Sequence, residues 1–144
     1  MRLPVSCVFM LSLLAVFVPA RAEDDIVAAA DRAAIRSVIE RQIAAFAKDD
    51  ATAAFGFASP AIQQQFGSPE TFLRMVQESY QPVYRPRSVS FGEARRLGGT
   101  VMQEVDVIGP DGLGAHASYA MEHERDGSWR IGGCTLMPGN EKEI

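Results

Sequence analysis

Three side chains able to do chemistry stand at positions that could share one face of a sheet: Glu93, Gln103 and Tyr119. Each belongs to a segment in which apolar and polar residues alternate, the pattern of a half-buried strand. If three-residue hairpin loops join the segments, the carboxylate, amide and phenol form one row between apolar rows, with Gly133 at its end. A few convergent polar groups among apolar ones are typical of a ligand pocket. Burial of Glu93 would raise its pKa, which suits a general acid or base.

Three further residues complete the candidate binding set. His123 ends the same segment as Tyr119 and is the alternative acid or base beside that phenol. Tyr80 and Tyr84 lie at and just beyond the end of the last predicted helix. A structural interpretation stays open for the row itself: Glu93 would mark the exposed end of the sheet, while the Gln103 and Tyr119 side chains would hydrogen-bond to each other.

The opposite face of the same sheet would carry charged pairs. The register places Asp106 opposite His116 and Glu122 opposite Arg130. An Asp–His pair could orient a catalytic triad, but no strained turn presents a nucleophile, so a solvated cross-strand ion pair is the favoured interpretation. His116 and His123 are an odd number of residues apart and point to opposite faces of a strand. We therefore expect neither a metal site nor a cofactor.

Composition narrows the class of protein. The chain has 144 residues, with 14 Lys and Arg against 18 Asp and Glu, and a formal charge of −4. This acidic balance argues against a nucleic-acid partner, which needs a clustered basic surface. An apolar share of 47% predicts a globular protein.

The N-terminus has the layout of a secretory signal peptide. A basic residue is followed by an apolar run from 3 to 18 and an A-x-A pattern ending at Ala22. The run is shorter than the roughly 20 residues that span a bilayer, which disfavours a retained membrane anchor. We expect a cleaved signal over 1–22, a single domain over 23–144, a periplasmic or secreted location and no membrane association after cleavage. Cys134 then remains alone and cannot form an internal disulfide. It is either a small buried residue, which is the favoured interpretation, or a partner in an intermolecular bond.

Helical patterns fill the first half of the domain. Asp24 and Asp25 could cap a long amphipathic helix that ends near Lys48, and Asp49 and Asp50 could cap a short one. Ser59-Pro60 and Ser68-Pro69 predict two further helix starts. Gly67 suits the end of the first of these helices, and Pro82 stops the second near Tyr80. The apolar stripe of the long helix comprises Ile35, Val38, Ile39, Ile43 and Phe46.

After Arg85-Pro86 the apolar period changes to two. Four alternating segments follow, separated by glycine-containing joints at 97–99, 110–112 and 125–127 that suit hairpin turns. The sequence therefore predicts an α+β fold: N-terminal helices packed on a curved, four-stranded antiparallel meander. In this arrangement Trp129 packs near His123 and Met121 on the side that faces the helices.

Several stretches resemble a bacterial family, domain of unknown function 4864. They are 39–50 (I-x-x-Q-I-x-A-F-x-x-D-D), 54–60 (A-F-x-F-A-S-P), 66–69 (F-G-S-P), 80–86 (Y-x-P-V-Y-R-P) and 126–134 (D-G-x-W-R-I-x-G-C). The element order is also similar to the wider, cone-shaped superfamily of nuclear transport factor two, SnoaL-like cyclases and ketosteroid isomerase. That likeness implies a pocket between the concave sheet and the helices, but no activity, since a fold does not fix a function.

Three function classes follow. The favoured one is a secreted pocket protein that binds a small apolar or amphipathic molecule unchanged. The second is an isomerase, dehydratase or cyclase that uses Glu93 or His123 together with Tyr119. The third is an interaction module in which the outer sheet face pairs two copies as a homodimer.

Overall fold

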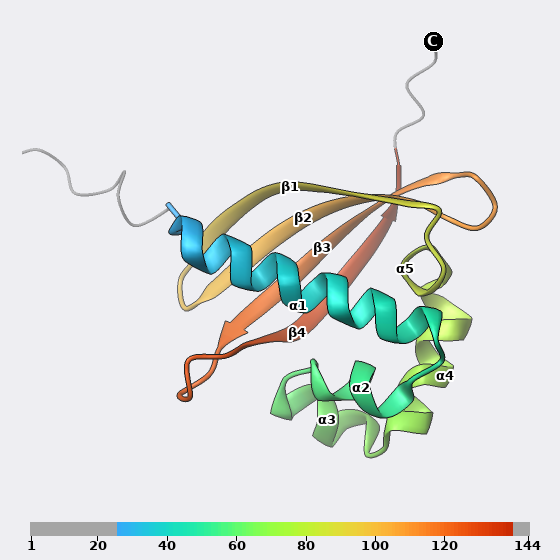
Figure 1. Cartoon of the computed structure of the whole chain (residues 1–144), viewed down its shortest axis with the longest axis horizontal. Coiled ribbons are helices and arrows are strands. Elements are labelled where there is room, and N and C mark those ends of the chain that lie inside the picture. Colours follow the sequence, from blue (N-terminus) through green and yellow to red (C-terminus); the bar gives the residue numbers. More distant parts are fainter. Residues whose placement is uncertain (1–25, 140–144) are drawn as a thin grey trace, which may run out of the picture.

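The computed structural model describes residues 26–139, in which helices are followed by one sheet (Figure 1). This order confirms the predicted α+β class with an antiparallel four-stranded sheet. The predicted signal peptide (1–22), Asp24 and Asp25 lie outside the described residues. The elements are α1 (Ala29–Ala47), α2 (Ala51–Gly56), α3 (Pro60–Phe66), α4 (Pro69–Ser79), α5 (Gln81–Tyr84), β1 (Ser88–Leu97), β2 (Thr100–Ile108), β3 (Gly114–His123) and β4 (Trp129–Pro138).

Side-chain caps set most of the helix starts. Asp50 accepts a hydrogen bond from the Ala53 N–H at the start of α2, and serines do the same for α3 and α4. Gly67 ends α3 in the left-handed region, with φ 77°, where a glycine avoids the clash of a Cβ atom. α1 differs from the prediction, because it begins at Ala29 after Ala28, which makes no side-chain cap bond.

The central ladder of the sheet has the predicted register. β2 and β3 pair without interruption, so Gln103 lies opposite Tyr119 and Asp106 opposite His116. Strand order follows the sequence, β1-β2-β3-β4. Glycine-containing joints close each hairpin. The first loop is shorter than predicted, because Leu97 pairs with Thr100 and leaves a two-residue loop, Gly98-Gly99, in place of a three-residue one.

Both edge ladders contain a register shift that the sequence analysis did not predict. In β1 the pairing slips between Phe91 and Ala94, so Gln103 faces Ala94 and not Glu93. The predicted row is therefore wrong at this end. A β-bulge adds one residue to a strand and reverses which side chains face the core beyond it.

A second shift lies between β3 and β4. The partner of Tyr119 is Cys134 and not Gly133, because the pairing slips between Ala120 and Met121. Beyond the shift, the even-numbered Cys134 and Leu136 pack against the core cluster. The predicted row is thus wrong at both ends and right in its centre.

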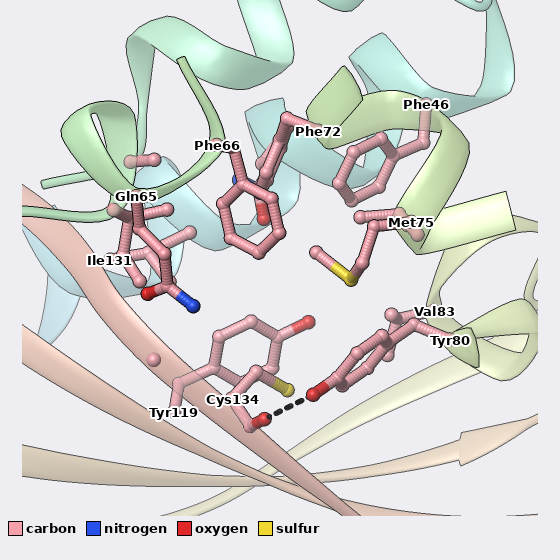
Figure 2. A pocket seen from close by; sticks show the side chains of 15 residues that line it. Phe46, Gln65, Phe66, Phe72, Met75, Tyr80, Val83, Tyr119, Ile131 and Cys134 are labelled. Carbon is pink, nitrogen blue, oxygen red and sulfur yellow. Dashed lines mark hydrogen bonds between the residues drawn. The ribbon is translucent and has the colours of Figure 1, made fainter. Parts of the chain in front are cut away.

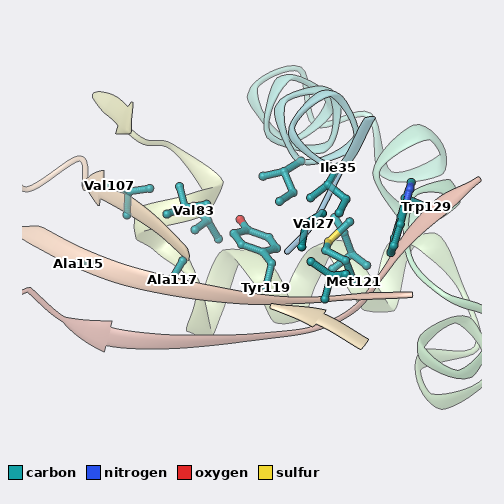
Figure 3. Packing of buried hydrophobic residues seen from close by; sticks show 13 residues of the cluster. Val27, Ile35, Val83, Val107, Ala115, Ala117, Tyr119, Met121 and Trp129 are labelled. Carbon is teal, nitrogen blue, oxygen red and sulfur yellow. The ribbon is translucent and has the colours of Figure 1, made fainter. Parts of the chain in front are cut away.

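The core lies between α1 and the sheet (Figure 3). α1 runs across one face of the sheet, while α2, α3 and α4 gather at one end of it (Figure 1). A second cluster of buried residues joins these helices around Phe46 and Phe72. The loop between α2 and α3 is tied to β4, because Ile131 donates its N–H to the Phe57 carbonyl and accepts from the Ser59 N–H. In the described part of the chain, no helix is long and apolar enough to cross a membrane.

Candidate functional site

A cavity of about 220 Å³ lies between the helices and the C-terminal half of the sheet (Figure 2). Its wall is mainly aromatic and aliphatic. The helices supply Phe46, Ile62, Phe66, Phe72, Met75 and Val76, and the sheet supplies Tyr119, Ile131, Gly133 and Cys134. The polar lining groups are the amides of Gln42 and Gln65, the hydroxyls of Tyr80 and Tyr119, and the Cys134 thiol.

Local structure explains why these residues meet. The Ser59 cap and its backbone bond to Ile131 place α3 over the edge of β4. The apolar face of α4 then turns Phe72 and Val76 inward, where both are buried. The register shift in β4 brings Cys134 next to Tyr119 on the same wall. The cavity thus depends on contacts between segments that are far apart in sequence.

The Tyr119 hydroxyl is the polar group at the floor of this cavity. The side chain is 1% exposed. Within residues 26–139, its Oη is the only buried side-chain oxygen or nitrogen without a hydrogen-bond partner in the protein. Burial raises the pKa of Tyr119 well above its ordinary range, and the adjacent Cys134 adds to the effect. The phenol is therefore neutral and keeps its proton available for donation.

Tyr80 and Cys134 form the adjacent wall. The Tyr80 hydroxyl donates to the Cys134 carbonyl at 3.2 Å, across the gap between α4 and β4. Burial raises the pKa of the Cys134 thiol to about 12. The predicted burial of this cysteine is met only in part, since its side chain is partly exposed. A thiol with such a pKa is protonated at neutral pH and is a poor nucleophile.

Glu93 does not lie in the cavity. Its carboxylate is exposed and forms an ion pair with Arg95 at 2.6 Å. The β1 bulge causes this placement, because it moves Ala94, and not Glu93, to the position opposite Gln103. The structural interpretation, in which Glu93 is exposed, is therefore the correct one for this residue.

Gln103 is buried, and its side chain hydrogen-bonds to the backbone at the β1 bulge. Its amide nitrogen donates to the carbonyls of Gly92 and Glu104, at 3.1 and 2.9 Å. The predicted hydrogen bond between the Gln103 and Tyr119 side chains is absent among these contacts, although the two residues are directly opposite. The amide instead donates to backbone oxygens beside the register shift, where the regular ladder is interrupted.

Tyr84 and His123 also lie outside the cavity wall. The Tyr84 hydroxyl contacts Asp49 and accepts from Gln77 at 3.1 Å, which fastens α5 to the corner between α1 and α2. His123 is exposed and stacks on Trp129, with ring centroids 4.4 Å apart. Of the six predicted candidates, Tyr80 and Tyr119 line the cavity.

The outer face of the sheet carries the predicted Asp–His pair within a larger cluster. His116 Nδ1 lies 2.7 Å from Asp106, and its Nε2 contacts Glu104. The Ser118 hydroxyl donates to Glu104 at 2.8 Å, not to the imidazole. No Ser–His–Asp relay therefore exists here. Asp106, and then Glu104, raise the pKa of His116. No cluster suited to a metal ion occurs among the described residues.

The helical residues that form most of the cavity wall were not predicted as site residues. Phe72 and Val76 follow a helical spacing that indicates burial, but burial alone does not separate a packed core from a cavity wall. Phe66 and Met75 have no such signal. Their role emerges only once α3 and α4 are placed over β4.

Comparisons with known proteins give one assignment. Searches of curated proteins and of solved structures found no match to this chain. The family model described as "Domain of unknown function (DUF4864)" matches residues 28–144, which includes all of the helices and strands above. The chain therefore belongs to the DUF4864 family.

Proposed function

We propose that this protein binds a small, mainly apolar molecule in the cavity between α3, α4 and β4. The observation that carries the proposal is the cavity itself, with an aromatic wall and few polar groups. That composition is typical of ligand sites. The same arrangement supports relating the fold to the nuclear-transport-factor-two-like superfamily, in which a pocket lies between helices and a curved sheet.

The volume limits the size of the molecule. An apolar cavity of roughly 150 Å³ accommodates benzene in a well-studied engineered protein. A cavity of about 220 Å³ is therefore suited to one ring with a short substituent. A steroid or a long acyl chain would extend through the mouth beside Gln65.

Binding is favoured over catalysis by what lines the cavity. The enzymatic alternative needs a carboxylate or imidazole near the ligand, and Glu93 and His123 both lie elsewhere. The cavity wall, in the described residues, has no Asp, Glu or His. The protonated Cys134 thiol and the Tyr119 phenol are poor bases for proton abstraction.

A block at the mouth of the cavity tests the proposal. Gln65 is exposed and its amide points toward the cavity (Figure 2). Gln65→Trp should close the mouth without disturbing the core, and Gln64→Trp is the matched control on the same helix. Titrations with cumene, followed by ligand-observed NMR, should show binding to the native protein and to Gln64→Trp, and weak or no binding to Gln65→Trp. Absence of cumene binding to the native protein would contradict the proposal.

We further propose that the protein is exported and acts in the periplasm or outside the cell. The support is the basic start, apolar run and A-x-A pattern of residues 1–22. N-terminal sequencing of the exported protein should begin at Glu23. Detection of Met1 on the exported form would refute this cleavage. Native mass spectrometry of the same preparation would identify any molecule that stays bound.

A further inference from the structure

We infer that the molecule bound in this cavity is uncharged and carries one hydrogen-bond acceptor, such as a carbonyl oxygen, which receives the proton of the Tyr119 hydroxyl. This inference rests on the proposed binding function and specifies its ligand class. Tyr119 would then be the residue that distinguishes an aryl ketone or aldehyde from a hydrocarbon of the same shape.

The position of the Tyr119 hydroxyl favours a ligand that bonds to it. The hydroxyl points toward the space enclosed by Met75 and Tyr80 (Figure 2). It is buried and has no oxygen or nitrogen partner within residues 26–139, and the adjacent Cys134 thiol is only a weak hydrogen-bonding group. A buried hydroxyl without a hydrogen bond destabilises the fold, whereas a phenylalanine would fill the same space without that cost. The hydroxyl is therefore better explained by recognition than by packing.

The protonation of the lining groups sets the direction of the hydrogen bond to the ligand. Because burial keeps both the Tyr119 phenol and the Cys134 thiol protonated, the cavity lining presents O–H and S–H groups and no anion. The phenol is a strong donor and the thiol a weak one. The complementary group on the ligand is an acceptor.

The lack of charged side chains among the described wall residues disfavours a charged ligand. The cavity wall in the described residues contains no Lys, Arg or His that could pair with an anion, and no Asp or Glu that could pair with a cation. Arg85 is near the cavity but is not part of its wall. Its guanidinium donates to the carbonyl of Phe46, a wall residue, at 2.8 Å. A buried charge without a partner is strongly unfavourable.

Three probes of similar shape separate these properties. Acetophenone has one ring and a neutral acceptor, cumene replaces the carbonyl by an apolar branch, and benzoate adds a negative charge. Dissociation constants would be measured for the native protein, Tyr119→Phe and Tyr84→Phe. Tyr84→Phe is the matched control, because it removes the same atom from a tyrosine outside the cavity.

We expect Tyr119→Phe to weaken the binding of acetophenone, relative to that of cumene, by roughly three- to tenfold. This ratio of dissociation constants corresponds to the loss of one net hydrogen bond. Tyr84→Phe should leave that ratio unchanged, and benzoate should bind far more weakly than acetophenone. If both neutral probes bind the native protein and Tyr119→Phe keeps the native ratio, the inference is wrong while the proposed binding function stands. Equal binding of benzoate also overturns the inference. If neither neutral probe binds, the inference and the proposed function both fail.

Discussion

Two tyrosines that line the cavity differ in what their hydroxyls contact. The Tyr80 hydroxyl donates to the Cys134 carbonyl, whereas the Tyr119 hydroxyl has no partner within the described residues. The same atom therefore contributes to stability at one position and subtracts from it at the other.

This contrast predicts opposite effects of one substitution. Tyr80→Phe should lower the free energy of unfolding by about 1 kcal/mol, because a hydrogen bond across the α4–β4 contact is lost. Tyr119→Phe should leave it unchanged or raise it, because an unpaired buried hydroxyl is removed. Urea unfolding of both variants checks this. A loss for Tyr119→Phe as large as that for Tyr80→Phe would mean that the Tyr119 hydroxyl has a partner in solution.

His116 should give stability a specific dependence on pH. Asp106 and Glu104 raise its pKa above the ordinary value of 6.5, so the folded state binds the imidazolium proton more tightly than the unfolded state does. The resulting stabilisation is fully present below about pH 6.5, the unfolded value, and is lost as pH rises through the raised pKa of the folded state.

The measurement compares unfolding of the native protein with that of His116→Gln at several pH values. The native protein should be more stable than the variant by a larger margin at pH 6 than at pH 9. The side chain is 39% exposed, so solvent screens the effect and the margin stays modest. A margin that grows with rising pH would show that His116 is not stabilised as the cation.

At the scale of the element, the bulge in β1 gives Gln103 its role. The buried amide donates to the Gly92 and Glu104 carbonyls. Gln103→Leu keeps much of the volume but leaves those oxygens without this donor, so we expect a loss of about 1–3 kcal/mol. Gln64→Leu, at an exposed position, is the control. Hydrogen exchange should show faster opening of β1 around residues 92–94, while binding of cumene should persist.

Helix starts and the central hairpin could be predicted because their signals are local. Asp50, Ser59 and Ser68 cap helices through atoms a few residues away, and one turn sets the β2–β3 register. The bulges were missed although a signal exists. Trp129 and Ile131 are odd-numbered core residues, whereas Cys134 and Leu136 are even-numbered, and Gly132 lies between the two pairs. A change of parity across a glycine within one strand indicates a bulge.

The candidate site could be predicted only in part, for the same physical reason. Tyr119 lies on the uninterrupted ladder, so its inward direction followed from alternation. Glu93 lies inside a bulge, where alternation fails. The contribution of Phe66 and Met75 to the cavity wall depends on how α3 and α4 pack on β4. No local sequence pattern predicts that packing.

For the whole molecule, the core between α1 and the sheet determines stability. Trp129 is 4% exposed and belongs to that cluster together with Met121. Trp129→Ala should lower the free energy of unfolding by about 3–5 kcal/mol through lost contacts and the cavity left behind. A change below about 1 kcal/mol would show that the ring adds little to the core. His123 is exposed and stacks face to face on this ring, so His123→Ala should have a smaller effect.

The sequential strand order has a consequence for folding kinetics. Every ladder joins neighbouring strands, so the sheet can form through contacts of low sequence separation, which form early. The cavity needs α3 and α4 to dock on β4, through contacts such as Tyr80 with Cys134 that are 54 residues apart. Substitutions in the β2–β3 hairpin should therefore change the folding rate, and those at Phe72 mainly the unfolding rate. A molecule bound in the cavity would then slow unfolding and leave the refolding rate unchanged.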